Sequence, residues 1–215
     1  EAELGARLHA AERVLALEAG LANRNRELGE AYARVRRELE MARALQRGLL
    51  PAPAQFAGAR FDWLFQASSY VGGDTFDYFQ VGPTQLCFHV VDVAGHGVAA
   101  AMMAFNAQHQ LRALSQQVAR TLLAQGRSLS ETAVHVVSDY NQRVLQSSRD
   151  PSHYLTLLYG LADLRAGQAA LVQAGHPPAL LAAAGSEDFR PVGEGGLPLG
   201  IVDDGGFEAR DIALS

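Results

Sequence analysis

Two stretches of sequence, VGGDTFD at residues 71–77 and VVDVAGHG at residues 90–97, decide the fold and the site of this protein. Each places an aspartate, Asp74 or Asp92, beside glycines at the expected end of a β-strand. Glycine lets the backbone come close to an ion or a phosphate. The second stretch leads directly into residues 99–114, which are rich in Ala, Met and Leu and predict a helix.

Two carboxylates at strand ends suit a hard divalent cation. Mg²⁺ and Mn²⁺ prefer oxygen ligands, and the sequence has no cluster of Cys or His around Asp74 and Asp92. Such ions lower the pKa of a bound water and hold a phosphoryl group for in-line attack. Aspartate and glycine also occur together in plain turns, so the residues alone support both a metal role and an ordinary turn.

The flanking pattern predicts an α+β domain with antiparallel sheets. A helix is expected after Ser128, because Ser128 and Glu131 form a capping box. Residues 86–91 are apolar on both faces, as in a sheet that is covered on each side. The expected order is strands, two helices, then strands. The strands are expected at residues 61–70, 76–80, 85–92, 154–161, 169–174 and 179–183.

Residues 1–50 have a different character, dense in charge and without proline. Apolar or small residues recur every seven positions from Val14 to Leu49, which predicts a parallel coiled coil and a homodimer. Arg24 and Glu38 interrupt the seam, and a long helix lying on its own domain is the alternative. Proline at positions 51 and 53 must end this helix. We therefore expect a linker helix at 1–50 and a second domain at 51–215. The recurring positions are Val14, Leu21, Leu28, Val35, Ala42 and Leu49, with Leu17, Ala31 and Leu45 between them.

Composition excludes several classes of function. The 215 residues carry a net charge of −5, with the acidic excess in residues 51–215, which disfavours binding to nucleic acid. There is neither a run long enough to span a membrane nor a signal-peptide pattern, so we expect a cytoplasmic protein without membrane contact. Cys87 is the single cysteine and is expected to be buried. The chain has no lysine and no P-loop.

The motifs resemble those of the SpoIIE/RsbU phosphatases in the protein phosphatase 2C (PPM) superfamily. Residues 72–77 and 92–100 are similar to the GGDxxD and DVSGHGxxAA motifs of that family. Four further segments resemble family segments and occur in the family's order across residues 38–215. They are LEMARALQRGLLP at 39–51, YLTL at 154–157, QAGHPP at 173–178 and GLPLG at 196–200.

The resemblance implies an αββα sandwich with a site for two Mn²⁺ or Mg²⁺ ions between its sheets. Asp92 would bridge the ions, Val93 would offer its backbone carbonyl, and Asp74 would be a further ligand. The implied reaction is hydrolysis of phosphoserine or phosphothreonine on a protein, with an anti-sigma-factor antagonist as the implied substrate. The seam of residues 1–50 is already established near Val14, so we expect an upstream receiver or sensor domain.

The sequence also departs from the family pattern. In the family, later aspartates complete the metal site, in a TDG motif and near the C-terminus, whereas this sequence ends at Ser215, where those segments would begin. Asp203 and Asp204 precede two glycines and are interpreted as turn residues. The alternative function is therefore an inactive module that dimerises and sequesters a regulator.

The other polar candidates are assigned structural roles. Asp77 matches the second aspartate of GGDxxD, and a hydrogen-bonded carboxylate outside the metal site is the favoured interpretation. His96 and His176 are expected to hold their loops by hydrogen bonds. Trp63, Met102 and Met103 are interpreted as packing residues.

Overall fold

The computed structural model describes residues 2–56, 58–147 and 154–214. The chain divides into two compact units, Glu1–Leu45 and Gln46–Ser215. Helix α1 spans Ala2–Leu49, so it provides all described residues of the first unit and the first residues of the second. Among the described residues, no helix is both long enough and apolar enough to cross a bilayer.

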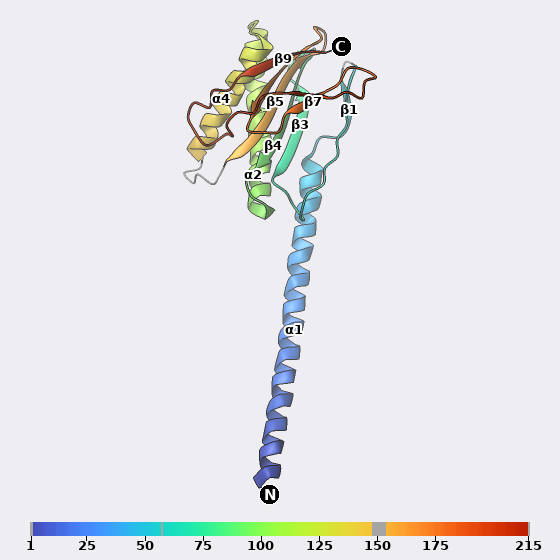
Figure 1. Cartoon of the computed structure of the whole chain (residues 1–215), viewed down its shortest axis with the longest axis vertical. Coiled ribbons are helices and arrows are strands. Elements are labelled where there is room, and N and C mark those ends of the chain that lie inside the picture. The colour runs from blue at the N-terminus through green and yellow to red at the C-terminus, as the bar shows by residue number, and fades with distance from the viewer. Residues whose placement is uncertain (1, 57, 148–153, 215) are drawn as a thin grey trace. The chain divides into compact units, whose positions relative to one another are not determined.

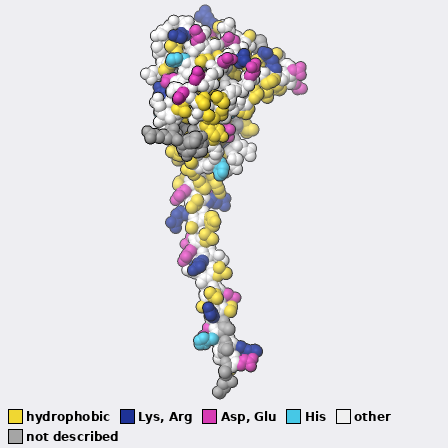
Figure 2. Space-filling model, turned by 60° about the vertical axis from the view of Figure 1, so that its left-hand side comes forward, with side chains coloured by type: hydrophobic (Ala, Val, Ile, Leu, Met, Phe, Trp, Pro, Cys, Tyr) yellow, Lys and Arg dark blue, Asp and Glu magenta, His cyan; other side chains and the backbone are white. Residues whose placement is uncertain are grey.

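Helix α1 leaves its apolar side chains in solvent. Leu21 and Leu45 are 61% and 71% exposed, and the other large residues of the heptad positions are also exposed. Figure 2 shows hydrophobic side chains interspersed with charged ones along this helix. A helix of this length gains little stability from propensity alone and is normally stabilised by packing of an apolar face. The exposed seam therefore remains available for a partner.

The second unit is built on a five-stranded antiparallel sheet with the order β3-β4-β5-β6-β9 (Figure 1). Two small hairpins, β1-β2 and β7-β8, accompany it. The strands of the large sheet are β3 (Asp74–Gln80), β4 (Gln85–Val93), β5 (Leu155–Asp163), β6 (Gln168–Ala174) and β9 (Ala209–Ala213). The hairpin strands are β1 (Ala54–Phe56), β2 (Ala59–Phe61), β7 (Ala179–Leu181) and β8 (Arg190–Val192).

Helices cover one face of the large sheet (Figure 1). They are α2 (Gly97–Leu114), the π-helical turn η1 (Ser115–Ala119), α3 (Arg120–Ala124) and α4 (Leu129–Ser147). In β4 the odd-numbered residues from Cys87 to Val93 are buried, and Cys87, Val91 and Val93 join the core beneath α2 and α4. Since side chains alternate along a strand, the even-numbered residues of β4 lie on the opposite face of the sheet.

Most sequence predictions of the fold are confirmed. The α+β class and the antiparallel sheets are present, and so are both predicted helices. The capping box exists, with the Glu131 amide donating to Ser128 Oγ at 3.2 Å and the Ser128 amide donating to Glu131 Oε2 at 3.3 Å. Cys87 is buried.

The predicted strand at residues 61–70 is wrong. Only Phe61 belongs to a strand, and the following residues form an irregular segment. Its aromatic residues pack by their rings: Trp63 and Phe65 both lie against Phe76, with ring centroids 5.3 and 6.4 Å away. The periodicity of these side chains thus reflects packing on β3 and not strand pairing. Met102 is also exposed and does not fill the core.

A partly buried ion pair attaches α2 to β3. Asp77 is 1% exposed and accepts two hydrogen bonds from Arg112, each 2.6 Å long. The Arg112 guanidinium also lies 4.4 Å from the centroid of the Phe79 ring. The carboxylate of Asp77 therefore belongs to the helix-covered face, which confirms that it is a hydrogen-bonded carboxylate outside the Asp74 and Asp92 pair.

We expect Arg112→Met to lower the free energy of unfolding by about 3 kcal/mol, because it leaves the Asp77 carboxylate buried without its cation. Urea denaturation followed by the fluorescence of Trp63, the single tryptophan, measures this change. Arg143→Met is the control, since its pair with Asp139 is largely exposed and its loss costs less than about 0.5 kcal/mol. An Arg112→Met protein as stable as the wild type would contradict the anchoring role.

Candidate metal centre

The strand pairing brings Asp74 and Asp92 together. Asp74 begins β3, Asp92 is the penultimate residue of β4, and the two are direct partners in the antiparallel register. Both lie on the sheet face opposite the helices, where they are exposed. Directly opposed residues on one face have Cβ atoms about 5 Å apart. The two carboxylates, which lie 18 positions apart in the sequence, therefore form one acidic pair.

The glycines before Asp74 bring the Val93 backbone to the same place. A Cβ atom on Gly73 would lie 2.8 Å from the Val93 carbonyl oxygen, so a larger residue there would force the two backbones apart. The Val93 amide donates to the Gly73 carbonyl at 3.2 Å. Gly72 is held in turn by Gln46, which donates to its carbonyl at 2.7 Å and accepts from its amide at 3.2 Å. Val93 thus has its backbone beside the acidic pair.

The Asp92 carboxylate perturbs the titration of Asp74. Partial burial raises the pKa of Asp74 above its usual 3.8, and the charge of Asp92 and a hydrogen bond between the two side chains raise it further. Asp74 therefore holds a proton more readily than an isolated aspartate. A divalent cation would relieve the same repulsion by replacing that proton.

Strand β5 and the turn after β6 add two residues, Thr156 and His176, that the sequence analysis did not assign to the site. Thr156 is the direct partner of Asp92 in the antiparallel register, so Asp74, Asp92 and Thr156 form a row across three adjacent strands. The Thr156 hydroxyl is 2.7 Å from His176 Nδ1. Burial lowers the pKa of His176 below its usual 6.5, while the negative charge of Asp92 acts in the opposite direction. His176 therefore lies within electrostatic reach of the acidic pair.

Other predicted candidates lie elsewhere or make different contacts. His176 does hold its loop by a hydrogen bond, as predicted. Among the described residues His96 makes no such bond: its side chain is exposed and does not cap α2. Asp204 accepts a hydrogen bond from the Gly206 amide at 3.1 Å, which is typical of a turn residue.

The donor set fits a hard cation that keeps part of its water shell. In the part of the chain that the structure describes, no group of three or more His, Cys, Asp or Glu side chains could hold a metal. Mg²⁺, however, is commonly bound through one or two carboxylates together with waters and phosphate oxygens. Two carboxylates with the Val93 carbonyl beside them match that mode of binding.

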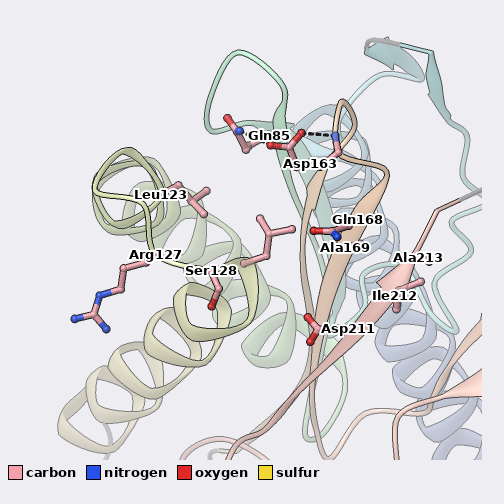
Figure 3. A pocket seen from close by; sticks show the side chains of 12 residues that line it. Gln85, Leu123, Arg127, Ser128, Asp163, Gln168, Ala169, Asp211, Ile212 and Ala213 are labelled. Carbon is pink, nitrogen blue, oxygen red and sulfur yellow. Dashed lines mark hydrogen bonds between the residues drawn. The ribbon is translucent and has the colours of Figure 1, made fainter.

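A cavity of about 650 Å³ lies at the opposite end of the strands (Figure 3). Its polar side chains are largely bonded already: Gln85 donates to Asp163 at 2.6 Å, and Asp163 accepts from the amides of Arg165 and Ala166. Asp211 accepts from Ser130. Arg127 points away from the sheet in Figure 3. We therefore place the candidate site at the acidic pair and not in this cavity.

Comparisons with known proteins define the class of this fold. The SiaA-PP2C domain of Pseudomonas aeruginosa superposes with a TM-score of 0.66 at 20% identity, covering 86% of this chain and 69% of that one. The PP2C phosphatase domain of the cell fate determinant SpoIIE from Bacillus subtilis, solved with a fragment of its regulatory domain, gives a TM-score of 0.52 at 18% identity. That match covers 67% of this chain and 39% of the other. The second unit therefore has the PP2C-type α+β fold.

The family follows from the sequence comparisons. The family model described as stage II sporulation protein E (SpoIIE) matches residues 82–215, and the chain belongs to this family. It is also 30% identical over 145 residues to the phosphoserine phosphatase RsbP of Bacillus subtilis (strain 168). That alignment covers 67% of this chain, which spans about a third of the relative, 34% of its length.

In the metal-free protein, we expect Asp92→Asn to lower the pKa of Asp74, because the amide carries no charge to repel the Asp74 carboxylate. Because the pKa of Asp74 is higher in the folded state than in the unfolded state, the free energy of unfolding is largest when Asp74 is protonated. As the pH rises above 3.8, the wild type should therefore lose stability relative to Asp92→Asn. Carboxyl ¹³C NMR titration measures the pKa, with Asp188→Asn as the control. An Asp74 pKa that is the same in all three proteins would contradict the coupling.

Proposed function

We propose that this chain is a metal-dependent phosphatase that removes phosphate from phosphoserine or phosphothreonine of a regulatory protein in the cytoplasm. The observation that carries the proposal is the direct pairing of Asp74 with Asp92 on the open face of the sheet. Membership of the SpoIIE family and the name of the relative RsbP, a phosphoserine phosphatase, support the same reaction class.

Each residue of the site has a distinct task in this proposal. Asp92, the central member of the row, is on strand β4 between β3 and β5, and it would be a ligand of both Mn²⁺ or Mg²⁺ ions. Asp74 and the Val93 carbonyl complete the ligands that the described residues supply. Ions bound there would supply Lewis acidity for in-line attack of water on phosphorus. Because the strands fix the carboxylates before substrate arrives, the bound cations would already be in position to stabilise the negative charge of the phosphoryl group in the transition state.

The substrate proposal is a phosphorylated anti-sigma-factor antagonist. It rests on the resemblance of residues 72–77 and 92–100 to the SpoIIE/RsbU motifs and on the name of the relative RsbP. The open acidic site suits a phosphorylated side chain presented by another protein, because both carboxylates are exposed at the surface.

We further propose that residues 1–50 act as a coiled-coil linker between an upstream receiver or sensor domain and the phosphatase domain at 51–215. The exposed heptad side chains of α1 support dimerisation through this helix. Signals from the upstream domain would then reach a pair of phosphatase domains.

The second candidate function is a module that dimerises and binds a regulator without hydrolysis. It is favoured by one observation: the described residues contain no group of three or more metal-ligating side chains. Metal binding separates the two candidates, since the interaction module needs no divalent ion.

For the phosphatase, we expect wild-type protein to bind Mn²⁺ in calorimetry and to hydrolyse a phosphoserine peptide. Asp92→Asn should weaken Mn²⁺ binding by about 100-fold or more, since loss of even an outer-shell partner can cost that much. Activity should fall with it. Asp188→Asn removes an equivalent charge from an exposed loop and should match the wild type. Equal activity in Asp92→Asn and wild type would defeat the assignment, and wild type without Mn²⁺ binding would favour the interaction module.

For the dimer, we expect sedimentation equilibrium to show that Leu21→Glu shifts the protein toward the monomer. Leu21 belongs to the predicted seam and is 61% exposed in the single chain, so glutamate there would introduce charges into the coiled-coil interface. Leu15→Glu is the matched control, because Leu15 is 65% exposed and lies outside the seam. A wild-type protein that stays monomeric at tens of micromolar would contradict the proposal.

A further inference from the structure

His176 is held more firmly than a surface loop requires. It follows β6 and Gly175, which forms a bridge with Leu157 of β5 and adopts a φ of +65°. A Cβ atom on Gly175 would lie 2.6 Å from the Pro198 ring, so the turn needs glycine for both its conformation and its packing. The ring of His176 is fixed through Nδ1, which is 2.7 Å from the Thr156 hydroxyl.

A second residue supports the same turn from behind. Gln173 is only 8% exposed, and its amide nitrogen donates to the His176 carbonyl. Its amide oxygen accepts from the Gly195 amide at 2.8 Å. A Cβ atom on Gly193 would lie 2.0 Å from the Gln173 side-chain oxygen, so the glycine-rich segment closes tightly over Gln173. The backbone and the ring of His176 are therefore positioned by separate groups.

The row of polar side chains has many acceptors and few donors. Ionised Asp74 and Asp92 can only accept hydrogen bonds, and a phosphate group also presents acceptors. Beside the two ionised carboxylates, the side chains with a proton to donate are Thr156 of the row and His176, which is hydrogen-bonded to Thr156. When the Thr156 hydroxyl donates to Nδ1, the imidazole carries its proton on Nε2. Among the described residues, the one hydrogen bond of the His176 ring is made through Nδ1, and the half-buried ring is not sealed from solvent.

We propose that His176 contacts the substrate, with its Nε2–H donating a hydrogen bond to a phosphoryl oxygen while Thr156 holds the ring in that orientation. The inference rests on the proposed function, because it places the phosphoryl group beside Asp74 and Asp92. Thr156 and Gln173 are positioning residues, since they act through His176. Hydrogen bonds from a neutral imidazole orient the phosphate without opposing the binding of cations nearby.

The first test uses the tautomer, which does not depend on activity. In ¹⁵N–¹H spectra of metal-free wild-type protein, His176 is expected as the Nε2–H tautomer, and Thr156→Val should disturb this preference whereas Thr156→Ser should preserve it. In the Mg²⁺-loaded protein, inorganic phosphate should shift the Nε2 resonance of His176. A His176 resonance unmoved by saturating phosphate, or a dominant Nδ1–H tautomer, would overturn the proposal.

The second test measures phosphate affinity against metal affinity. His176→Ala should raise the inhibition constant of inorganic phosphate and the KM for a phosphoserine peptide by about tenfold, as expected for one hydrogen bond to a charged group. His176→Gln, which retains a donor near the Nε2 position, should recover most of this loss. Mn²⁺ affinity should change less than about twofold in both variants. His135→Ala, on the exposed side of α4, is the matched control.

The outcomes separate the inference from the proposed function. If wild type hydrolyses the peptide and His176→Ala binds phosphate equally well, the His176 assignment fails and the phosphatase assignment stands. If His176→Ala loses Mn²⁺ as strongly as Asp92→Asn, His176 supports the metal ligands and does not contact phosphate. If wild type neither binds a divalent ion nor hydrolyses the peptide, the proposed function fails, and the assignment of His176, which rests on it, fails with it.

Discussion

The antiparallel register of β3 with β4 is the constraint on which the rest of the structure depends. It places Asp74 opposite Asp92 and Asp77 opposite His89, on the two faces of the same pair of strands. Because side chains alternate along a strand, a slip by one residue would turn Asp74 toward the core and a buried side chain toward solvent. The acidic pair exists only in this one register.

Polar contacts beneath the helices hold that register. Gln108 of α2 accepts from the Thr75 hydroxyl at 3.1 Å and donates to the Phe76 and Leu49 carbonyls. Arg112, one turn further along α2, binds Asp77. These bonds are specific to position, whereas apolar packing of Val91 or Val93 would tolerate small shifts. The helix-covered face therefore specifies the alignment, and the open face carries the candidate chemistry.

The sequence predicted those features of the structure that depend on neighbouring residues in the chain. The apolar run of β4, the capping box before α4 and the glycine-flanked Asp74 and Asp92 were all visible along the chain. Strand β9 was missed because it is short and three of its five residues are exposed, so only its pairing with β6 makes it a strand. Thr156 and His176 were not assigned to the site because their position also depends on contacts between distant parts of the chain. Their nearness to Asp92 comes from the pairing of β4 with β5 and from the bridge between Leu157 and Gly175, which no local pattern reports.

The two faces of the sheet also differ in what they contribute to stability. On the helix side, His89 is buried, and neither ring nitrogen has a hydrogen-bond partner among the described residues. Burial lowers its pKa to about 4, so the core accepts a neutral imidazole beside the bonded Asp77–Arg112 pair. On the open side, the raised pKa of Asp74 means that ionising the pair opposes folding, with a cost that grows as the pH rises above 3.8. A cation that binds only the folded protein reverses this cost by mass action. The pairing of Asp74 with Asp92 destabilises the protein when no cation is bound, yet the register of β3 with β4 keeps the two residues together. This is understandable if the acidic pair serves to bind a cation.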